Sequence, residues 1–227
     1  MLRLRCEHLK ECTVNSSVKL ERAEENHLFK VMRAKPGNEI ELLDGKGERG
    51  IAVIGREREI ILRSRHTESF PGRRIHLYIA PPRRQKMDQL LHAAAELGVY
   101  RIVPVLCEYS VAEPDADSVE RWNMVMFESC KQSGNVYLPQ IETPVPFEKA
   151  IVDSAEKCDL VFTGSPYADK TDLQNLPGEI GFFVGPEGGF SAQETAAMEK
   201  AGFRFLRIGP WILRVETAAI AGIACLR

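Results

Sequence analysis

Two glycine-proline segments near the end of the chain have the composition of ligand-binding turns. The first is VGPEGGFSAQE, Val184 to Glu194, and the second is the IGP of FRFLRIGPWILR, Ile208 to Pro210. Each follows an apolar run, EIGFFV or FRFLRI, that predicts a buried strand. Glycine lets a ligand approach the backbone closely, and proline stiffens a turn. If the two strands are neighbours in one sheet, the turns form a cleft lined by backbone donors and acceptors.

The first segment differs from the common phosphate-binding loops. A Walker loop requires Gly-Lys followed by Ser or Thr, where this segment has Gly-Gly-Phe. The first strand–turn–helix unit also lacks G-x-G-x-x-G, the pattern of dinucleotide sites. Glu187 would repel a phosphate. These residues favour a small polar ligand with a positive or hydrogen-bond-donating face, and the alternative is that both turns are only structural.

The elements that must position these turns alternate between strands and helices from residue 74 onward. Apolar strands are expected at IHLYIA, RIVPVLC, CDLVFT, EIGFFV and FRFLRI. Helices are expected over 85–98, 117–132, 191–200 and 216–226. Ser191 and Glu194 have the spacing of a capping box at the start of the third helix. The alternation predicts a parallel α/β sheet, a fold that binds ligands at the carboxyl ends of its strands.

Residues 1–70 are instead rich in short strands and tight turns, which predicts a small barrel or sandwich. Just before the hairpin EIELLDGKGERGIAVI, the stretch HLFKVMRA predicts a short helix. It is expected to turn Leu28, Val31 and Met32 toward the core. Its basic residues Lys30 and Arg33 then face solvent. SFPGRR is the expected linker, so we expect domains over 1–70 and 74–227.

Composition and charge exclude several protein classes. The 227 residues contain no run of about 18 apolar residues that would predict a membrane span, and MLRLRCEHLKEC lacks the pattern of a secretory signal. The six cysteines form no CxxC pair and the five histidines have no metal-ligand spacing, so we expect a cytoplasmic protein with reduced thiols and no metal. The net charge of −2 conceals a basic first third, because residues 1–74 contain 16 Lys and Arg against 12 Asp and Glu. This surplus favours contact with a polyanion, and a solvated surface is the alternative.

The whole set of motifs resembles one known family. GPEGGFSAQE, followed by IGPWILRVETA, is similar to the signature of the RsmE family of 16S rRNA uridine-N3 methyltransferases, which belongs to the SPOUT class. KMDQLLHAAAELGVYRIVPV, RWNMVMFESCKQSGNVYLPQI and HLFKVMRAKPGNEIELLDGKG resemble further family motifs in the same order. The resemblance therefore covers nearly the whole chain, and the joint occurrence of these motifs is specific.

The resemblance implies both a fold and a reaction. The expected fold is an N-terminal PUA-like β-barrel that binds RNA, over 1–70, followed by an α/β SPOUT domain over 74–227 with a C-terminal deep trefoil knot. The expected cofactor is S-adenosyl-L-methionine, bound at the knot of a homodimer. The expected substrate is a uridine N3 of 16S rRNA in the small ribosomal subunit. Periodicity alone predicts no knot, since threaded chains are rare.

The resemblance also carries over individual residues. The cofactor-binding positions expected from it are Thr163, Gly164, Val184, Gly185, Pro186, Glu187, Gly188, Gly189, Ile208, Gly209, Ile212 and Leu213. Arg214 is the expected catalytic cation, which would stabilise the negative charge left on the base when N3 loses its proton. The alternative for Arg214 is a structural ion pair with Glu216 or Glu187. Lys30 and Arg33 are expected to contact RNA phosphates, with solvated surface as the alternative.

Several positions depart from the family pattern, mostly by losing a positive charge. His92-Ala93 replace Gln-Lys, while Tyr109, Asn135 and Trp211 each stand where Arg is usual and Val215 stands where Thr is usual. Asn135 is retained as a catalytic candidate because it can donate a hydrogen bond to a uracil oxygen. Trp211 is expected in the core, with stacking on a base as the alternative. Two other functions stay open: a non-catalytic rRNA-binding or assembly protein, and a SPOUT methyltransferase with a different RNA target.

Overall fold

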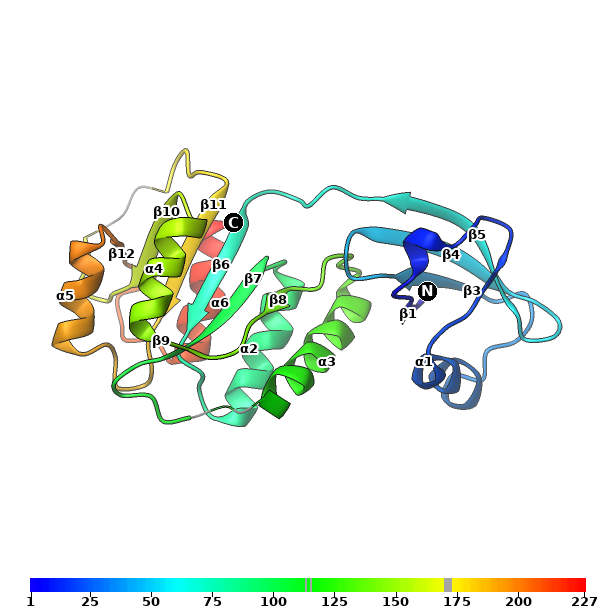
Figure 1. Ribbon diagram of the computed structural model, residues 1–227, viewed down its shortest axis with the longest axis horizontal. Coiled ribbons are helices and arrows are strands. Elements are labelled where there is room, and N and C mark those ends of the chain that lie inside the picture. The colour runs from blue at the N-terminus through cyan, green and yellow to red at the C-terminus, as the bar shows by residue number, and fades with distance from the viewer. Residues whose placement is uncertain (113, 115, 170–172) are drawn as a thin grey trace. The chain divides into compact units, whose positions relative to one another are not determined.

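The computed structural model describes residues 1–112, 114, 116–169 and 173–227, and its contacts divide the chain into two compact units (Figure 1). The N-terminal unit comprises Met1–Pro71 and Phe127–Leu138, and the C-terminal unit comprises Gly72–Met126 and Pro139–Arg227. The second unit thus starts close to the expected linker, while a segment from the middle of the chain joins the first. Within the described ranges, no helix has the length and apolar character to cross a membrane.

The N-terminal unit is a five-stranded sheet wrapped around an apolar core. Its strands are β1 (Leu2–Arg5), β2 (Ser17–Val18), β3 (Glu39–Leu43), β4 (Glu48–Ile54) and β5 (Ile60–Thr67), in the order β1-β3-β4-β5-β2. Short helices η1 (Leu9–Glu11), α1 (Arg22–Asn26) and η2 (His27–Val31) connect them. β3, β4 and β5 form an antiparallel meander, and β1 lies parallel to β3. Alternate residues of β4 are buried, as expected for a strand with one face on the core.

The short helix before β3 differs from its prediction. Leu28 is fully buried as expected, but placing Val31 and Met32 in the core was wrong, since these side chains are 66% and 50% exposed. The cause is the wide π-type turn over His27–Val31, in which the N–H of Met32 bonds to the carbonyl of His27, five residues back. A wider turn rotates the later side chains away from the face that an α-helical spacing assigns to the core.

The C-terminal unit is the predicted parallel α/β sheet, in the order β12-β10-β11-β6-β7-β8, with β9 paired to β7. Its strands are β6 (Arg74–Ile79), β7 (Arg101–Leu106), β8 (Gln140–Ile141), β9 (Val145–Pro146), β10 (Leu160–Gly164), β11 (Glu179–Val184) and β12 (Arg204–Leu206). Its helices are α2 (Arg84–Glu96), α4 (Phe147–Lys157), α5 (Ala192–Lys200) and α6 (Val215–Leu226), and α3 (Ala116–Ser133) belongs to it up to Met126. Every strand pair in this sheet is parallel.

Helices cover both faces of this sheet (Figure 1). α4 packs on β7, β9 and β11, while α6 packs on β6, β11 and α2. On the α4 side, the rings of Tyr78 and Phe183 stack at 4.4 Å between centroids. On the α6 side, a Cβ at Gly222 would lie 2.2 Å from the ring of Phe182, so only glycine lets the helix approach this closely. The apolar residues of α6 that face the sheet are therefore part of the core.

An ion pair within the α/β unit fixes α4 to β7. The Arg101 guanidinium, only 8% exposed, donates to both Asp153 oxygens at 2.6 and 3.0 Å and to Glu142 at 2.6 Å. The hydroxyl of Tyr78 donates to Asp153 at 2.7 Å. Burial by itself would raise the pKa of Asp153, but the hydrogen bonds from Arg101 and Tyr78 lower it below its usual value. Because the ionised carboxylate is favoured in the fold, it stabilises the folded protein.

We predict that Asp153→Asn lowers the free energy of unfolding by about 2–3 kcal/mol at pH 7, because Arg101 loses its charged partner. The pKa of Asp153 is depressed in the folded protein. The stabilisation from its carboxylate is therefore complete above the unfolded-state pKa, about 3.9, and is lost as the pH falls through the folded-state pKa. Urea unfolding at pH 7 and at successively lower pH should show wild type and variant converging under acid. Glu156→Gln, at an exposed position of the same helix, is the matched control. Equal stability of Asp153→Asn and wild type at pH 7 would contradict this account.

Candidate functional site

The loops predicted to bind a ligand lie at one edge of the C-terminal sheet. β10 pairs in parallel with β11 on one side and with β12 on the other, so the carboxyl ends of the three strands are adjacent. The sequence analysis expected a cleft between the two turns only if β11 and β12 were neighbours. This condition is not met, because β10 lies between them. The central strand adds a third loop, which starts at Thr163-Gly164. The site is thus built from three loops, after β10, β11 and β12.

Hydrogen bonds fix the positions of these loops. The Ser165 N–H donates to the carbonyl of Leu206 at 3.0 Å, which connects the β10 loop to the end of β12. The carbonyl of Val184 accepts from Ala80 at 2.9 Å, so the β11 loop starts beside the end of β6. Within the β11 loop, the N–H of Gly189 donates to the carbonyl of Pro186 at 2.9 Å and closes a tight turn. Gly189 has φ of +76°, a conformation that residues with a side chain rarely adopt.

The predicted capping box at the start of α5 is confirmed, and it does more than begin the helix. The Ser191 N–H donates to one oxygen of Glu194 at 2.8 Å, and the Glu194 N–H donates to the Ser191 hydroxyl at 3.2 Å. The other Glu194 oxygen accepts the Glu108 N–H at 2.9 Å. Glu194 is only 7% exposed, so one buried carboxylate joins the β11 loop to the loop after β7. The contact with Glu108 was missed because these residues are 86 positions apart.

Three glycines in the loops leave open space beside the backbone. A Cβ placed at Gly189 or Gly209 would meet no atom within 4 Å, and one at Gly164 would meet only the Ile208 side chain, at 3.8 Å. These glycines come one from each loop. Their backbone is thus accessible to a ligand in the way that the sequence analysis expected for a close-fitting site. Glu187, at the exposed tip of the β11 loop, adds a carboxylate to this edge.

Arg214 lies directly before α6, at its N-cap position, and is exposed. In the part of the chain that the structure describes, it forms no ion pair with Glu216 or Glu187. Glu216 pairs instead with Lys86 of α2 at 2.8 Å, and the hydrogen bond from Lys86, together with the nearby charge of Arg214, lowers the pKa of Glu216. The proposed structural pairing of Arg214 is therefore not found, and its guanidinium faces solvent at the end of the β12 loop. Lys86 is a residue that the sequence analysis did not assign.

Asn135 lies in the N-terminal unit, and Arg214 lies in the other. The side-chain oxygen of Asn135 accepts the Tyr137 N–H at 2.9 Å, which fixes the turn after α3. Arg3 and Arg49 bind the carbonyls just before this turn. Arg3 donates to Lys131 and Gln132 at 2.9 and 2.8 Å, and Arg49 donates to Gly134 at 2.9 Å. Cations are favourable near the C-terminal carbonyls of a helix. The sequence could not assign Arg3 and Arg49 to this role, because they lie 85 or more positions from the carbonyls that they bind.

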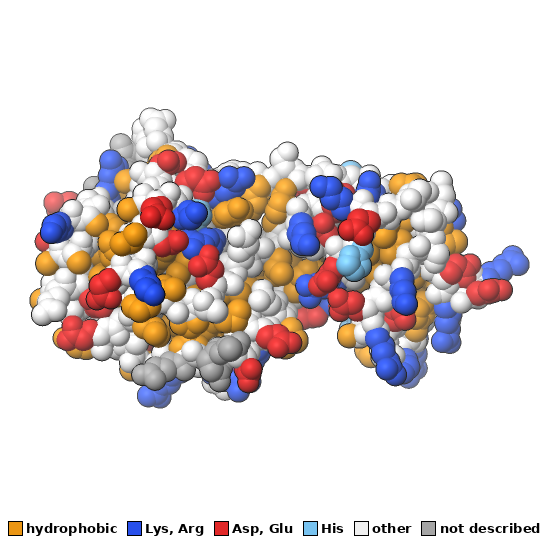
Figure 2. All heavy atoms as spheres, in the orientation of Figure 1, with side chains coloured by type: hydrophobic (Ala, Val, Ile, Leu, Met, Phe, Trp, Pro, Cys, Tyr) orange, Lys and Arg blue, Asp and Glu red, His pale blue; other side chains and the backbone are white. Residues whose placement is uncertain are grey.

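The remaining predicted residues are on the surface. Lys30 and Arg33 are exposed in the N-terminal unit, and on the face shown in Figure 2 basic and acidic side chains alternate over this unit. The core prediction for Trp211 was wrong, because this side chain is 78% exposed, as is that of Ile212. Base stacking therefore stays open for Trp211. The described residues contain no cluster of three or more His, Cys, Asp or Glu that could bind a metal ion.

Comparisons with known proteins agree with this geometry. A sequence model of an RNA methyltransferase domain matches residues 68–227, and one of an RNA methyltransferase PUA domain matches residues 20–63. Ribosomal RNA small subunit methyltransferase E from Synechocystis is 26% identical over 223 residues, which cover 94% of this chain and 74% of that protein. The Neisseria gonorrhoeae enzyme of this name, solved bound to S-adenosyl methionine, is 29% identical with a TM-score of 0.88, over 100% of this chain and 96% of that one. A methyltransferase from Legionella pneumophila, solved with bound cofactor SAM, is 26% identical with a TM-score of 0.88, over 99% and 96% of the chains.

We predict that Glu194→Ala lowers the free energy of unfolding by about 2 kcal/mol, because it removes a helix cap and leaves the buried N–H of Ser191 and the N–H of Glu108 without their acceptor. Thermal unfolding of the two variants Glu194→Ala and Glu199→Ala checks this. Glu199 is exposed on the same helix, so its removal should change Tm little. A shift of the same size in both variants would mean that the carboxylate does not join the two loops.

Proposed function

We propose the following reaction for this chain, which belongs to the RNA methyltransferase family: methylation of a uridine N3 in 16S rRNA of the small ribosomal subunit, with S-adenosylmethionine as the methyl donor. The observation that carries the proposal is the set of three adjacent loops with accessible glycine backbone, in a chain similar along its whole length to methyltransferases solved with this cofactor. The uridine N3 specificity rests on the RsmE resemblance.

The three loops fit the cofactor. S-adenosylmethionine supplies a methyl group bound to a positively charged sulfur, so it is attracted rather than repelled by a carboxylate such as that of Glu187. Open space beside Gly164, Gly189 and Gly209 allows a bulky ligand to reach the backbone. The residues proposed to bind it lie at the ends of the three strands: Thr163, Gly164, Val184, Gly185, Pro186, Glu187, Gly188, Gly189, Ile208, Gly209, Ile212 and Leu213.

The protein must prepare the target nitrogen for this chemistry. N3 lies on the Watson–Crick edge of uracil and carries a proton, so the base must be unpaired and the proton must leave. The resulting negative charge spreads over O2 and O4. The Arg214 guanidinium, which is not used in an ion pair within the described part of the chain, is proposed to stabilise that charge. The oxygen of Asn135 accepts from Tyr137, so its proposed hydrogen bond to a uracil oxygen is donated by the side-chain nitrogen.

The two units are proposed to have separate roles in binding the RNA and the cofactor. The N-terminal unit, with Lys30 and Arg33 exposed, binds rRNA phosphates, and the C-terminal unit binds the cofactor. The β11 to α6 segment is proposed to form the deep trefoil knot of the SPOUT class. Modification of a ribosomal subunit places the protein in the cytoplasm.

We further propose a homodimer that uses the outer side of α6. This helix is apolar almost all round, and several of its residues that do not face the sheet are exposed, including Ala224 and Cys225. Trp211 and Ile212, each 78% exposed, are two more exposed apolar side chains shortly before the helix. Exposed apolar patches of this kind are typical of association sites. Light scattering on the purified chain tests this, and a monomer mass at micromolar concentration would exclude a stable dimer.

The experiment that tests the reaction measures transfer of labelled methyl groups to small subunits and to naked rRNA from cells that lack this protein. Mass spectrometry then identifies the modified nucleoside. We expect 3-methyluridine. A methyl group elsewhere would identify a different RNA target. Binding of the cofactor and of rRNA without any transfer would favour the non-catalytic alternative.

We predict that Gly209→Val weakens binding of S-adenosylmethionine by at least about tenfold, because a side chain at this position enters the space reserved for the ligand. The position has an ordinary backbone conformation and no neighbour within 4 Å, so folding should be preserved. Gly178→Val is the matched control, because Gly178 also has no neighbour within 4 Å but precedes the amino end of β11. Calorimetric titration compares the two, and equal affinities would remove the β12 loop from the site.

We predict that Arg214→Ala lowers kcat about 100-fold or more while the cofactor affinity stays near that of wild type, because the guanidinium acts on the charge that develops in the base. Arg207→Ala, a loss of one exposed arginine in the same loop, should change kcat little. Single-turnover methyl transfer at saturating RNA separates this effect from weaker RNA binding. A variant with normal kcat and a raised KM would make Arg214 an RNA-binding residue instead.

A further inference from the structure

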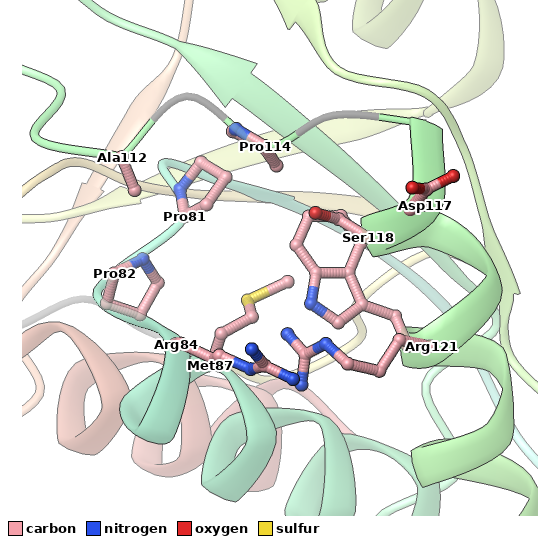
Figure 3. A pocket seen from close by; sticks show the side chains of 10 residues that line it. Pro81, Pro82, Arg84, Met87, Ala112, Pro114, Asp117, Ser118 and Arg121 are labelled. Atoms are coloured by element: carbon pink, nitrogen blue, oxygen red, sulfur yellow. The ribbon is translucent and has the colours of Figure 1, made fainter.

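A cavity of about 310 Å³ in the C-terminal unit is not part of the three loops. It is lined by the residues that follow β6, by the first turns of α2 and α3, and by residues 112 and 114 (Figure 3). Such a volume is at the lower end of the range for small-molecule sites. Pro81 lines the cavity and directly follows Ala80, whose N–H donates to Val184 before the β11 loop. The cavity is therefore at the same edge of the sheet as the cofactor loops.

The floor of the cavity is apolar. Pro81 and Pro82 are buried, and Met87 and Trp122 are only 1% and 2% exposed. The indole Nε1 of Trp122 is buried and has no hydrogen-bond partner within the described residues. Because this nitrogen is covered, the floor offers a ligand apolar surface rather than a hydrogen bond. Proline rings and an indole also suit the face of a planar ring.

The mouth of the cavity is positively charged. Arg84 of α2 and Arg121 of α3 both line it, and their guanidinium groups point toward one another (Figure 3). Arg121 pairs with Asp88, while Arg84 has no ion pair among the residues that the structure describes. The N-terminus of the 18-residue helix α3, with Ser118 in its first turn, adds a partial positive charge. Asp117 is an exposed carboxylate at this rim, so the guanidinium groups are the better position for an anion.

We propose that this cavity binds one unpaired nucleotide of the RNA substrate. The base lies on the apolar floor formed by Pro81, Pro82, Met87 and Trp122. The phosphate lies against the guanidinium groups of Arg84 and Arg121, whose planar donor sets match phosphate oxygens. The proposal rests on the proposed function, because it assumes an RNA substrate, and it adds a place where the strand is fixed beside the methyl-transfer loops.

The test uses uridine 5′-monophosphate as the probe and Trp122 as the reporter. The chain has two tryptophans, so in the full-length Trp211→Phe protein Trp122 alone gives the indole emission. We expect the nucleotide to change this emission saturably, and ribose 5-phosphate, which lacks the base, to bind about tenfold more weakly. Arg84→Ala should weaken nucleotide binding about tenfold. Its matched control is Arg83→Ala, at an exposed neighbouring position that does not line the cavity.

Several results would overturn the proposal: no change of Trp122 emission at millimolar nucleotide, equal losses in Arg83→Ala and Arg84→Ala, or equal affinity for ribose 5-phosphate. Methyl transfer measured on the same preparations distinguishes the two hypotheses. Active transfer that is unaffected by Arg84→Ala, without nucleotide binding, would reject the cavity alone. Nucleotide binding without any transfer would reject the proposed reaction alone.

Discussion

The parallel pairing of β10 with both β11 and β12 is the constraint on which the functional edge of this protein depends. Parallel strands end at the same edge of a sheet, so this pairing places three loops side by side although the paired residues are 20 or more positions apart in sequence. The loops proposed to bind the cofactor need no long-range side-chain contact to meet, because the backbone ladder aligns them. Side-chain contacts such as those of Glu194 then fix the loops relative to their neighbours.

Charged residues fall into two groups in this structure. The residues of one group make contacts that stabilise the fold. Arg101 fixes α4 to β7, while Arg3 and Arg49 bind carbonyls near the end of α3. The other group, which includes Arg84 and Arg214, has no ion pair within the described part of the chain. A guanidinium that already forms an ion pair has few N–H donors left to bind a ligand. One without an ion pair can stabilise a phosphate or a developing negative charge. The number of arginines in the sequence does not reveal which of them form ion pairs. This distinction matters for a chain that lacks several basic residues of the RsmE pattern.

At two of the positions where the RsmE pattern has an arginine, the structure shows the surroundings of the present side chain. Asn135, in place of an arginine, uses its side-chain oxygen to fix a local turn. Trp211, also in place of an arginine, is exposed beside Ile212 before α6. Neither residue replaces the lost charge, so the contacts proposed for this chain that need a positive charge fall to other side chains. The exposed guanidinium groups of Arg84 and Arg214 are the ones proposed to make them.

The sequence by itself determined the local features of this protein. Strand and helix alternation, the capping box of Ser191 and Glu194, and the glycine-rich turns were predicted correctly because residues close in the chain decide them. Tertiary structure decided the rest. β10 separates β11 from β12, a π-type turn exposes Val31 and Met32, and Lys86 rather than Arg214 pairs with Glu216. Each of these depends on the packing of a whole segment or on contacts between residues far apart in sequence, and free energies of that kind are not encoded in any local pattern of residue types.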